Sequence, residues 1–489
     1  MNLRGEPERE RARPLAGTGP KELWARQLSG YAAAHAAPLL AGVAGLVVLP
    51  RLLGTEAYGR YAVAVGVATV SAAILADWIV PTGLRLVPEA AGDAGQLWRV
   101  LGMMSAIAGL ASGLLAGFLA LPLGRALSLS AIALASASAL ARPFATWLRA
   151  AMRTGLYAAF SAASAGGSLA LGALLYVATG SLPAILLGAC VPALVGAAWY
   201  ARVTGWPLHA PRQVGRWFNE ALRFGLPIMV TGVGGQTLLL ADRYILALLI
   251  GSDGAGRYAA TYGASEKLVG LPFAVLFSAM YPVGAAAWAA GDRAQALDLV
   301  RATGRVFSVV AGSLGVFQAF SGPWLVGLLA GEAFRPPRML PALVSFGTWF
   351  WFLGILQHQA LEWEKRTLAI TGLTLGAAGL NVAANLVLIP VMALVGAGTA
   401  TTGAYAVYLA GVTFVVCRRK RGYRVWEVKP VLVAAGVALI SGMSFPGSAR
   451  PIAGCVAVVS YVLVTWILGA WRLEEFRGLL RHAVGRDRR

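Results

Sequence analysis

Long stretches without a charged side chain constrain this chain more than any other feature. Residues 154–201 and 367–417, for example, contain no Asp, Glu, Lys or Arg. About 20 apolar residues in a helix cross the hydrocarbon core of a bilayer, so stretches twice that long need two spans and a turn. Of all residues, 58% are hydrophobic and only 13% are charged, whereas soluble domains carry about a quarter charged residues. The sequence therefore predicts a multi-pass membrane protein.

The predicted fold class is an all-α polytopic bundle. The stretches are continuously apolar, whereas strands of a membrane barrel alternate polar and apolar residues over about ten positions. We predict 14 transmembrane helices, with approximate limits at 28–49, 61–83, 100–122, 126–147, 154–178, 183–201, 224–250, 257–283, 306–328, 339–361, 367–389, 395–417, 430–449 and 451–470.

The basic residues predict the orientation of these helices. Most of the 41 Lys and Arg fall in tails and connections that share one side if both termini lie in the cytoplasm, and the richest clusters are at 418–424 and 472–489. Lys and Arg collect on the cytoplasmic side of membrane proteins. We therefore expect an even number of spans in the cytoplasmic (inner) membrane, with both termini inside. Topology and contacts with anionic lipids then explain the net charge of +20 without a nucleic-acid partner.

One sequence stretch occurs twice. "LLGTEAYGRYA" at 52–62 and "LIGSDGAGRYA" at 249–259 share six identities at a constant offset of 197 residues. Both fall in outer turns, and six spans separate them, so the two copies have the same orientation. We predict two six-helix lobes related by a pseudo-two-fold axis along the membrane normal. The alternative is that Gly and small polar residues only mark two turns.

The duplication sets the predicted domain limits. Residues 28–205 form the first lobe and residues 206–425 the second. The remaining segments are a cytoplasmic tail at 1–27, two additional helices at 426–471 and a basic cytoplasmic tail at 472–489. Segments 28–201 and 224–417 should superpose by a rotation of about 180° about the membrane normal.

Three longer stretches resemble a known family. "RLLGTEAYGRYAVA" at 51–64, "ADRYILALLIGSDGAGRYAATY" at 241–262 and "GLNVAANLVLIPVMALVGAGTATTGAY" at 379–405 resemble the polysaccharide transporter branch of the multidrug/oligosaccharidyl-lipid/polysaccharide exporter superfamily. The resemblance implies two six-helix lobes, often with two further helices, around a central cavity. It also implies a flippase that moves a lipid-linked oligosaccharide or polysaccharide precursor to the outer leaflet by alternating access.

Four charged residues lie within the spans of the second lobe. Asp242 and Arg243 precede the outer turn at Gly251, and Glu266 and Lys267 follow it, at distances that put both pairs near the middle of the membrane. Charges at this depth are costly and usually face a cavity or a partner. Arg243 and Lys267 are candidates for binding the diphosphate of the substrate. Asp242 and Glu266 are candidates for coupling to H⁺ or Na⁺, or for ion pairs that lock a helical hairpin: Asp242 with Lys267, or Arg243 with Glu266.

A second basic set lies nearer the predicted cytoplasmic side. Arg85 follows the second span, and Arg142 and Arg149 are two helical turns apart, so they share a face of one helix. Arg grips phosphate oxygens in pairs, which makes these residues further substrate-binding candidates. Ordinary positive-inside flanks are the alternative for all three. Asp77, at the end of the second span, is a candidate ion-coupling or structural charge, although it stands further from Gly83 than the family's usual acidic residue.

Other functions are weighed by the same features. A drug/cation antiporter of the same superfamily would favour acidic groups in its cavity, whereas the acids within these spans are matched by bases. A membrane glycosyltransferase or ligase would need a long outer loop, and the longest outer connection surrounds "AGEAFRPPR". A scaffold without a transport cycle is a further alternative. Cys190, Cys417 and Cys455 lack a metal-binding spacing, so no cofactor or metal is expected. The expected partners are the lipid-linked sugar, membrane lipids, H⁺ or Na⁺, and other polysaccharide-assembly proteins.

Overall fold

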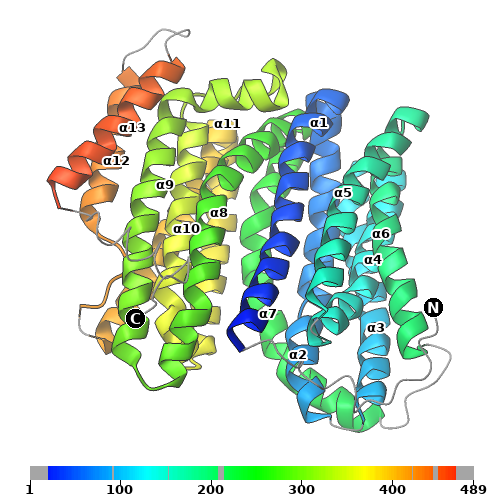
Figure 1. Ribbon diagram of the computed structural model, residues 1–489. Coiled ribbons are helices and arrows are strands. Elements are labelled where there is room, and N and C mark those ends of the chain that lie inside the picture. Colours follow the sequence, from blue (N-terminus) through cyan, green and yellow to red (C-terminus); the bar gives the residue numbers. More distant parts are fainter. Residues whose placement is uncertain are drawn as a thin grey trace.

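The computed structural model describes residues 20–90, 93–151, 153–206, 214–420, 422–443 and 450–469, and this part of the chain is all-α (Figure 1). Ten of its helices are long and apolar enough to cross a membrane. Large apolar side chains remain exposed on them, such as Phe118 at 70% and Val391 at 81%, as expected for surfaces that contact lipid. The protein is therefore a multi-pass membrane protein.

The helices follow the predicted order. In the first lobe they are α1 (Pro20–Ala76), α2 (Ile79–Glu89), α3 (Ala94–Ala120), α4 (Arg125–Ala150), α5 (Thr154–Thr179) and α6 (Leu182–Thr204). In the second lobe they are α7 (Val214–Leu249), α8 (Ser252–Ala289), α9 (Arg293–Ala330), α10 (Leu340–Trp363) and α11 (Thr367–Arg419), followed by α12 (Val428–Met443) and α13 (Arg450–Ile467). Short 3₁₀ turns, η1 (Leu121–Leu123) and η2 (Glu332–Phe334), precede α4 and α10.

Two of these helices each contain a break between two predicted spans. α1 departs from helical geometry at Gly54, with φ 76°, and α11 at Ala393, with φ 48°. Each break lies in a predicted turn, so each long element contributes two spans. The count of 14 spans remains a prediction, because residues 444–449 and 470–489 lie outside the described residues, as does the tail at 1–19.

The second predicted span, 61–83, is interrupted in the structure. α1 ends at Ala76, and α2 begins at Ile79. Pro81 lies in the first turn of α2, where the missing backbone N–H removes no helical hydrogen bond. The indole N–H of Trp78 donates to the carbonyl of Leu75 at 2.8 Å across the break. Hydropathy alone does not reveal this interruption, since apolar residues continue through it.

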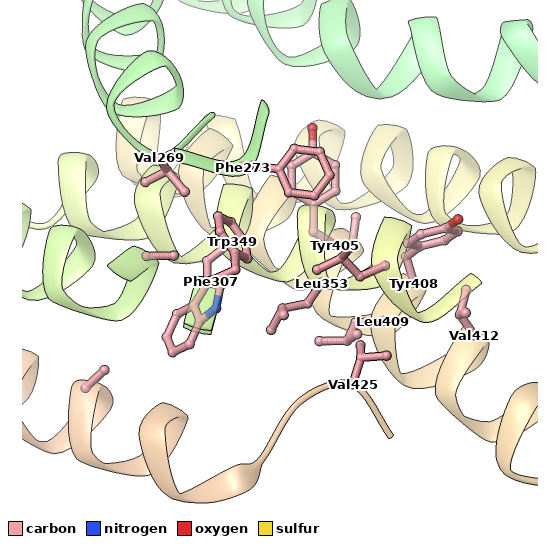
Figure 2. Close-up of a cluster of buried hydrophobic side chains, with 14 of the residues drawn as sticks. Val269, Phe273, Phe307, Trp349, Leu353, Tyr405, Tyr408, Leu409, Val412 and Val425 are labelled. Carbon is pink, nitrogen blue, oxygen red and sulfur yellow. The ribbon is translucent and has the colours of Figure 1, made fainter. Parts of the chain in front are cut away.

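The second lobe has a large aromatic core. Figure 2 shows Phe273 of α8, Phe307 of α9, Trp349 of α10 and Tyr405 of α11 packed together, and all four are buried. α12 and α13 pack against α9 on the outer flank of this lobe (Figure 1). They are additions to the lobe rather than part of the boundary between lobes.

The two copies of the repeated stretch meet in the structure. A Cβ added at Gly59 would overlap the carbonyl of Ser252, and a Cβ added at Gly256 would overlap the carbonyl of Thr55. Gly256 and Ser252 are the equivalents of Gly59 and Thr55 at the offset of 197 residues. The contact is therefore reciprocal, which is the relation that a two-fold axis between the copies produces. Superposition of the complete lobes remains a prediction.

Candidate functional site: a cavity between the lobes

A cavity of about 800 Å³ lies between the lobes. Its wall comes from α1, α4, α5 and α6 on one side and from α7 and α8 on the other. The volume falls within the roughly 300–1,000 Å³ typical of ligand sites. The predicted two-lobe arrangement thus encloses a space of suitable size for a polar headgroup.

Four charged side chains line this cavity, and bases predominate. They are Arg142 on α4, Arg243 on α7, and Glu266 and Lys267 on α8. Three bases and one acid give the wall a net charge of +2. The two charged pairs predicted near mid-membrane therefore supply three of the four charges, and the first lobe supplies the fourth. An arrangement of this sign favours an anionic ligand.

Arg243 is held in place without a full set of hydrogen-bond partners. Its guanidinium carbon lies 4.7 Å from the centre of the Tyr262 ring, in a cation–π contact that orients the side chain. Its buried Nε–H has no acceptor among the described residues. A buried donor without an acceptor is unfavourable, so binding of an oxyanion here would satisfy it.

Lys267 reaches from the second lobe to the first. A Cβ added at Gly42 of α1 would lie 2.9 Å from Cε of Lys267. The lysine stem therefore packs directly against the α1 backbone. This base belongs to one lobe and contacts the other, so movement between the lobes changes its surroundings.

Arg142 and Asp77 form an ion pair that the sequence analysis did not predict. Arg142 Nε lies 2.7 Å from Asp77 Oδ1, and both side chains are more than a third exposed. The break between α1 and α2 places Asp77 there. A partly exposed pair of this kind contributes little to stability, so Arg142 can exchange the carboxylate for another anion at low cost.

Arg85 and Arg149 do not line this cavity. The Arg85 guanidinium lies over the Phe224 ring at 4.4 Å, and that of Arg149 lies 5.8 Å from the Tyr157 ring. Arg149 falls in the last turn of α4. The seven-residue spacing correctly predicted that Arg142 and Arg149 lie on one helix. It did not show that only Arg142 of the two lines the cavity.

Asp242 is buried and does not line the cavity, and its side-chain partners belong to the second lobe. Its carboxylate accepts hydrogen bonds from the Tyr258 hydroxyl at 2.6 Å, the Arg243 backbone N–H at 2.7 Å and the Thr401 hydroxyl at 3.3 Å. Within the described residues, no ion pair shorter than 4.0 Å joins Asp242 to Lys267 or Arg243 to Glu266. The alternative of an ion-paired hairpin is therefore not found among the described residues, and Asp242 is instead a hydrogen-bonded carboxylate.

The Asp242 network continues through two asparagines that the sequence analysis missed. Asn381 donates to Thr401 at 3.2 Å, and Asn385 donates to the Asn381 side chain at 3.1 Å. All are nearly or fully buried, and Asn385 Oδ1 has no donor among the described residues. The sequence signal that could have revealed this network is the pair Asn381 and Asn385, two amides one helical turn apart in an otherwise apolar stretch. Carboxylate, amide and hydroxyl oxygens together suit a small hard cation.

Comparison with known proteins agrees with this architecture. A family model described as "Polysaccharide biosynthesis protein" matches residues 31–288. The chain belongs to this family. The match confirms the family resemblance and covers two of the three sequence stretches, 51–64 and 241–262. No curated protein matches the chain by sequence.

One solved structure supports the fold. The structure of the lipid II flippase MurJ in an inward closed conformation is similar with a TM-score of 0.63 and 12% identity, over 92% of this chain and 99% of that chain. An inward-facing multidrug resistance MATE family transporter of the MOP superfamily aligns with a TM-score of 0.48 and 15% identity, over 83% and 95% of the two chains. A MOP superfamily transporter from Pyrococcus furiosus has a TM-score of 0.43 and 12% identity, over 82% and 96%.

Proposed function

We propose that this protein is a flippase for a lipid-linked oligosaccharide or polysaccharide precursor. The cavity carries the proposal, because three bases from two lobes face one anion-sized space with a single acid among them. Family membership and the fold shared with a lipid II flippase support the same function. The work consists of moving a charged headgroup across the membrane, so no covalent bond is made or broken.

The diphosphate headgroup rests on Arg243 and Lys267 in this proposal. Arg243 offers a planar fork with an unused Nε–H, which suits bidentate binding to phosphate oxygens. Arg142 exchanges Asp77 for the same anion. The lipid tail stays in the bilayer between the lobes, and the lobes alternately expose the cavity to either side.

The driving ion acts at Asp242 in this proposal. The buried carboxylate and its neighbours Thr401, Asn381 and Asn385 form an oxygen-rich cluster. Asp242 directly precedes Arg243 in α7, so this cluster lies beside the proposed substrate site. Binding of H⁺ or Na⁺ there changes the charge next to the substrate site. We further propose a cytoplasmic (inner) membrane location with both termini in the cytoplasm, where the precursor is made.

The charge of the cavity disfavours the alternative of a drug/cation antiporter. A cationic substrate needs carboxylates, and Glu266 is the one acid among the cavity-lining residues. The bases would instead repel such a substrate.

Reconstitution of the purified protein with a lipid-linked sugar tests the proposed function. We expect delivery of the headgroup to the opposite leaflet, and accumulation of the lipid intermediate on the cytoplasmic side in cells that lack the gene, as measured by mass spectrometry. Normal levels of every lipid-linked sugar in such cells, together with no movement in vesicles, would exclude the proposal.

A further inference from the structure

A second pocket, here called the inner pocket, lies within the second lobe at the end predicted to face the cytoplasm. Its volume is about 570 Å³. It forms where α8 and α10 end, where α9 begins, and where the two ends of α11 lie. Its lining residues are Trp288, Arg293, Trp363, Glu364, Lys365, Arg366 and Arg419. None of them lines the cavity between the lobes.

Bases outnumber acids in the inner pocket by four to one. The single acid, Glu364, is already paired, with Lys420 Nζ at 2.9 Å and with Arg366 Nε at 3.5 Å. Lys365 adopts a left-handed conformation, with φ 60°, which is uncommon for a residue with a side chain. This tight turn brings three charged residues in succession to the pocket wall.

Two tryptophans complete the wall. The rings of Trp288 and Trp363 lie 5.6 Å apart, and the Arg293 guanidinium lies 5.3 Å from the Trp288 ring. The buried indole N–H of Trp363 has no acceptor among the residues that the structure describes. The pocket wall therefore contains a neutral donor without a partner, in addition to the excess positive charge of the lining residues.

The N-terminus of α11 adds to this preference for anions. Its N-cap residue, Arg366, provides no side-chain hydrogen bond to the first turn. The free N–H groups of that turn are donors for a negative ligand nearby, whereas the C-termini of α8, α10 and α11, which also meet here, offset the helix dipole.

We infer that the inner pocket binds the phosphodiester headgroup of an anionic membrane lipid. Tryptophan and basic residues gather at the headgroup level of a bilayer, and basic pockets between helix ends on the cytoplasmic side hold acidic headgroups. Free phosphate is also an anion, but it has no apolar part that could pack against the two tryptophan rings. The inner pocket shares no lining residue with the proposed substrate cavity. The lipid-binding inference and the proposed function can therefore be tested independently.

Native mass spectrometry of the full-length protein in detergent tests this site. Binding of phosphatidylglycerol is compared with binding of phosphatidylcholine, for the natural protein and for a Lys365→Gln/Arg419→Gln variant. The side chains of Lys365 and Arg419 are both exposed. We expect the natural protein to bind phosphatidylglycerol preferentially. The double variant should bind it about tenfold more weakly or worse.

A matched control removes the same charge elsewhere at the predicted inner end. Arg202→Gln/Arg223→Gln alters two exposed bases outside the inner pocket and should retain the affinity. Trp363→Phe keeps an aromatic ring but removes the unused donor, and it should weaken binding about threefold.

Three results would overturn the inference. These are equal binding of the two lipids, equal loss of affinity in the inner-pocket and control variants, or displacement of the lipid by millimolar inorganic phosphate that binds equally well alone. The last result would identify a site for free phosphate. Transport activity does not enter this measurement, so its outcome does not depend on the proposed flippase function.

Discussion

At the level of single residues, Arg243 and Asp242 are adjacent in sequence and have opposite surroundings. Arg243 faces the cavity, and we expect Arg243→Ala to lower flipping by about 30-fold or more, because a charge-assisted contact to phosphate is lost. Arg243→Lys should recover only part, since a point charge does not reproduce a bidentate grip. Headgroup delivery per amount of folded protein measures both.

A double variant separates binding from structural pairing. If Arg243 served only to balance Asp242, Asp242→Asn/Arg243→Gln would restore what either single change loses. We expect no rescue. Arg257→Gln, which removes a half-buried base outside the cavity that is paired with Asp253 at 3.1 Å, serves as the control with unchanged activity. Full activity in the double variant would remove Arg243 from the site and leave Lys267 and Arg142.

Asp242 is expected to govern the response to the coupling ion. A cation that binds only the folded state stabilises it, by about 2.7 kcal/mol when the cation concentration is 100 times its dissociation constant. The melting temperature rises as a result. The melting temperature of the purified protein is measured over a range of Na⁺ concentrations and, separately, over a range of pH. We expect either Na⁺ or H⁺ to raise it. Asp242→Asn should abolish this effect, whereas Asp253→Asn at an exposed position should not. An ion effect that is unchanged in Asp242→Asn would contradict the assignment.

At the level of elements, α1 and α8 meet through backbone rather than side chains. Gly59→Leu would force a side chain into the Ser252 carbonyl, so we expect the two helices to separate. Spin labels at the exposed positions Glu56 and Asp253 should report a short distance in the natural protein and a longer or broader one in Gly59→Leu. Gly155→Leu, where a Cβ meets nothing within 4 Å, should leave the distance unchanged. Equal distances in all three proteins would rule out a tight contact.

Elements were easier to predict from the sequence than the partners of their side chains. The predicted span at 126–147 and the observed α4 agree closely, because apolar length alone specifies a helix in a membrane. Counting residues back from the outer turn predicted one depth for Arg243 and Lys267, and both residues line the same cavity. The direction of each side chain did not follow, so the Asp77–Arg142 pair and the Asn381 network were missed. Those contacts depend on how helices far apart in the chain are rotated against one another.

At the level of the whole molecule, the distribution of basic residues predicts the orientation in the membrane. The positive-inside bias requires the basic segment at 472–489, outside the described residues, to be cytoplasmic. A reporter fused after residue 489 should be active only on the cytoplasmic side, and one inserted at the turn between α7 and α8 only on the outer side. The reverse pattern would invert the molecule and place the inner pocket outside the cell.

The reciprocal glycine contact also has a mechanical consequence. It lies near one end of α8, a helix of 38 residues, which at 1.5 Å per residue is about 57 Å long. A lever of this length, turned by about 10° about a pivot at one end, moves its far end by about 10 Å. A bulky headgroup can thus be admitted by a small change in angle while every helix stays intact. Bare backbone suits such a pivot, because it has no side chains that must change rotamer as the angle changes.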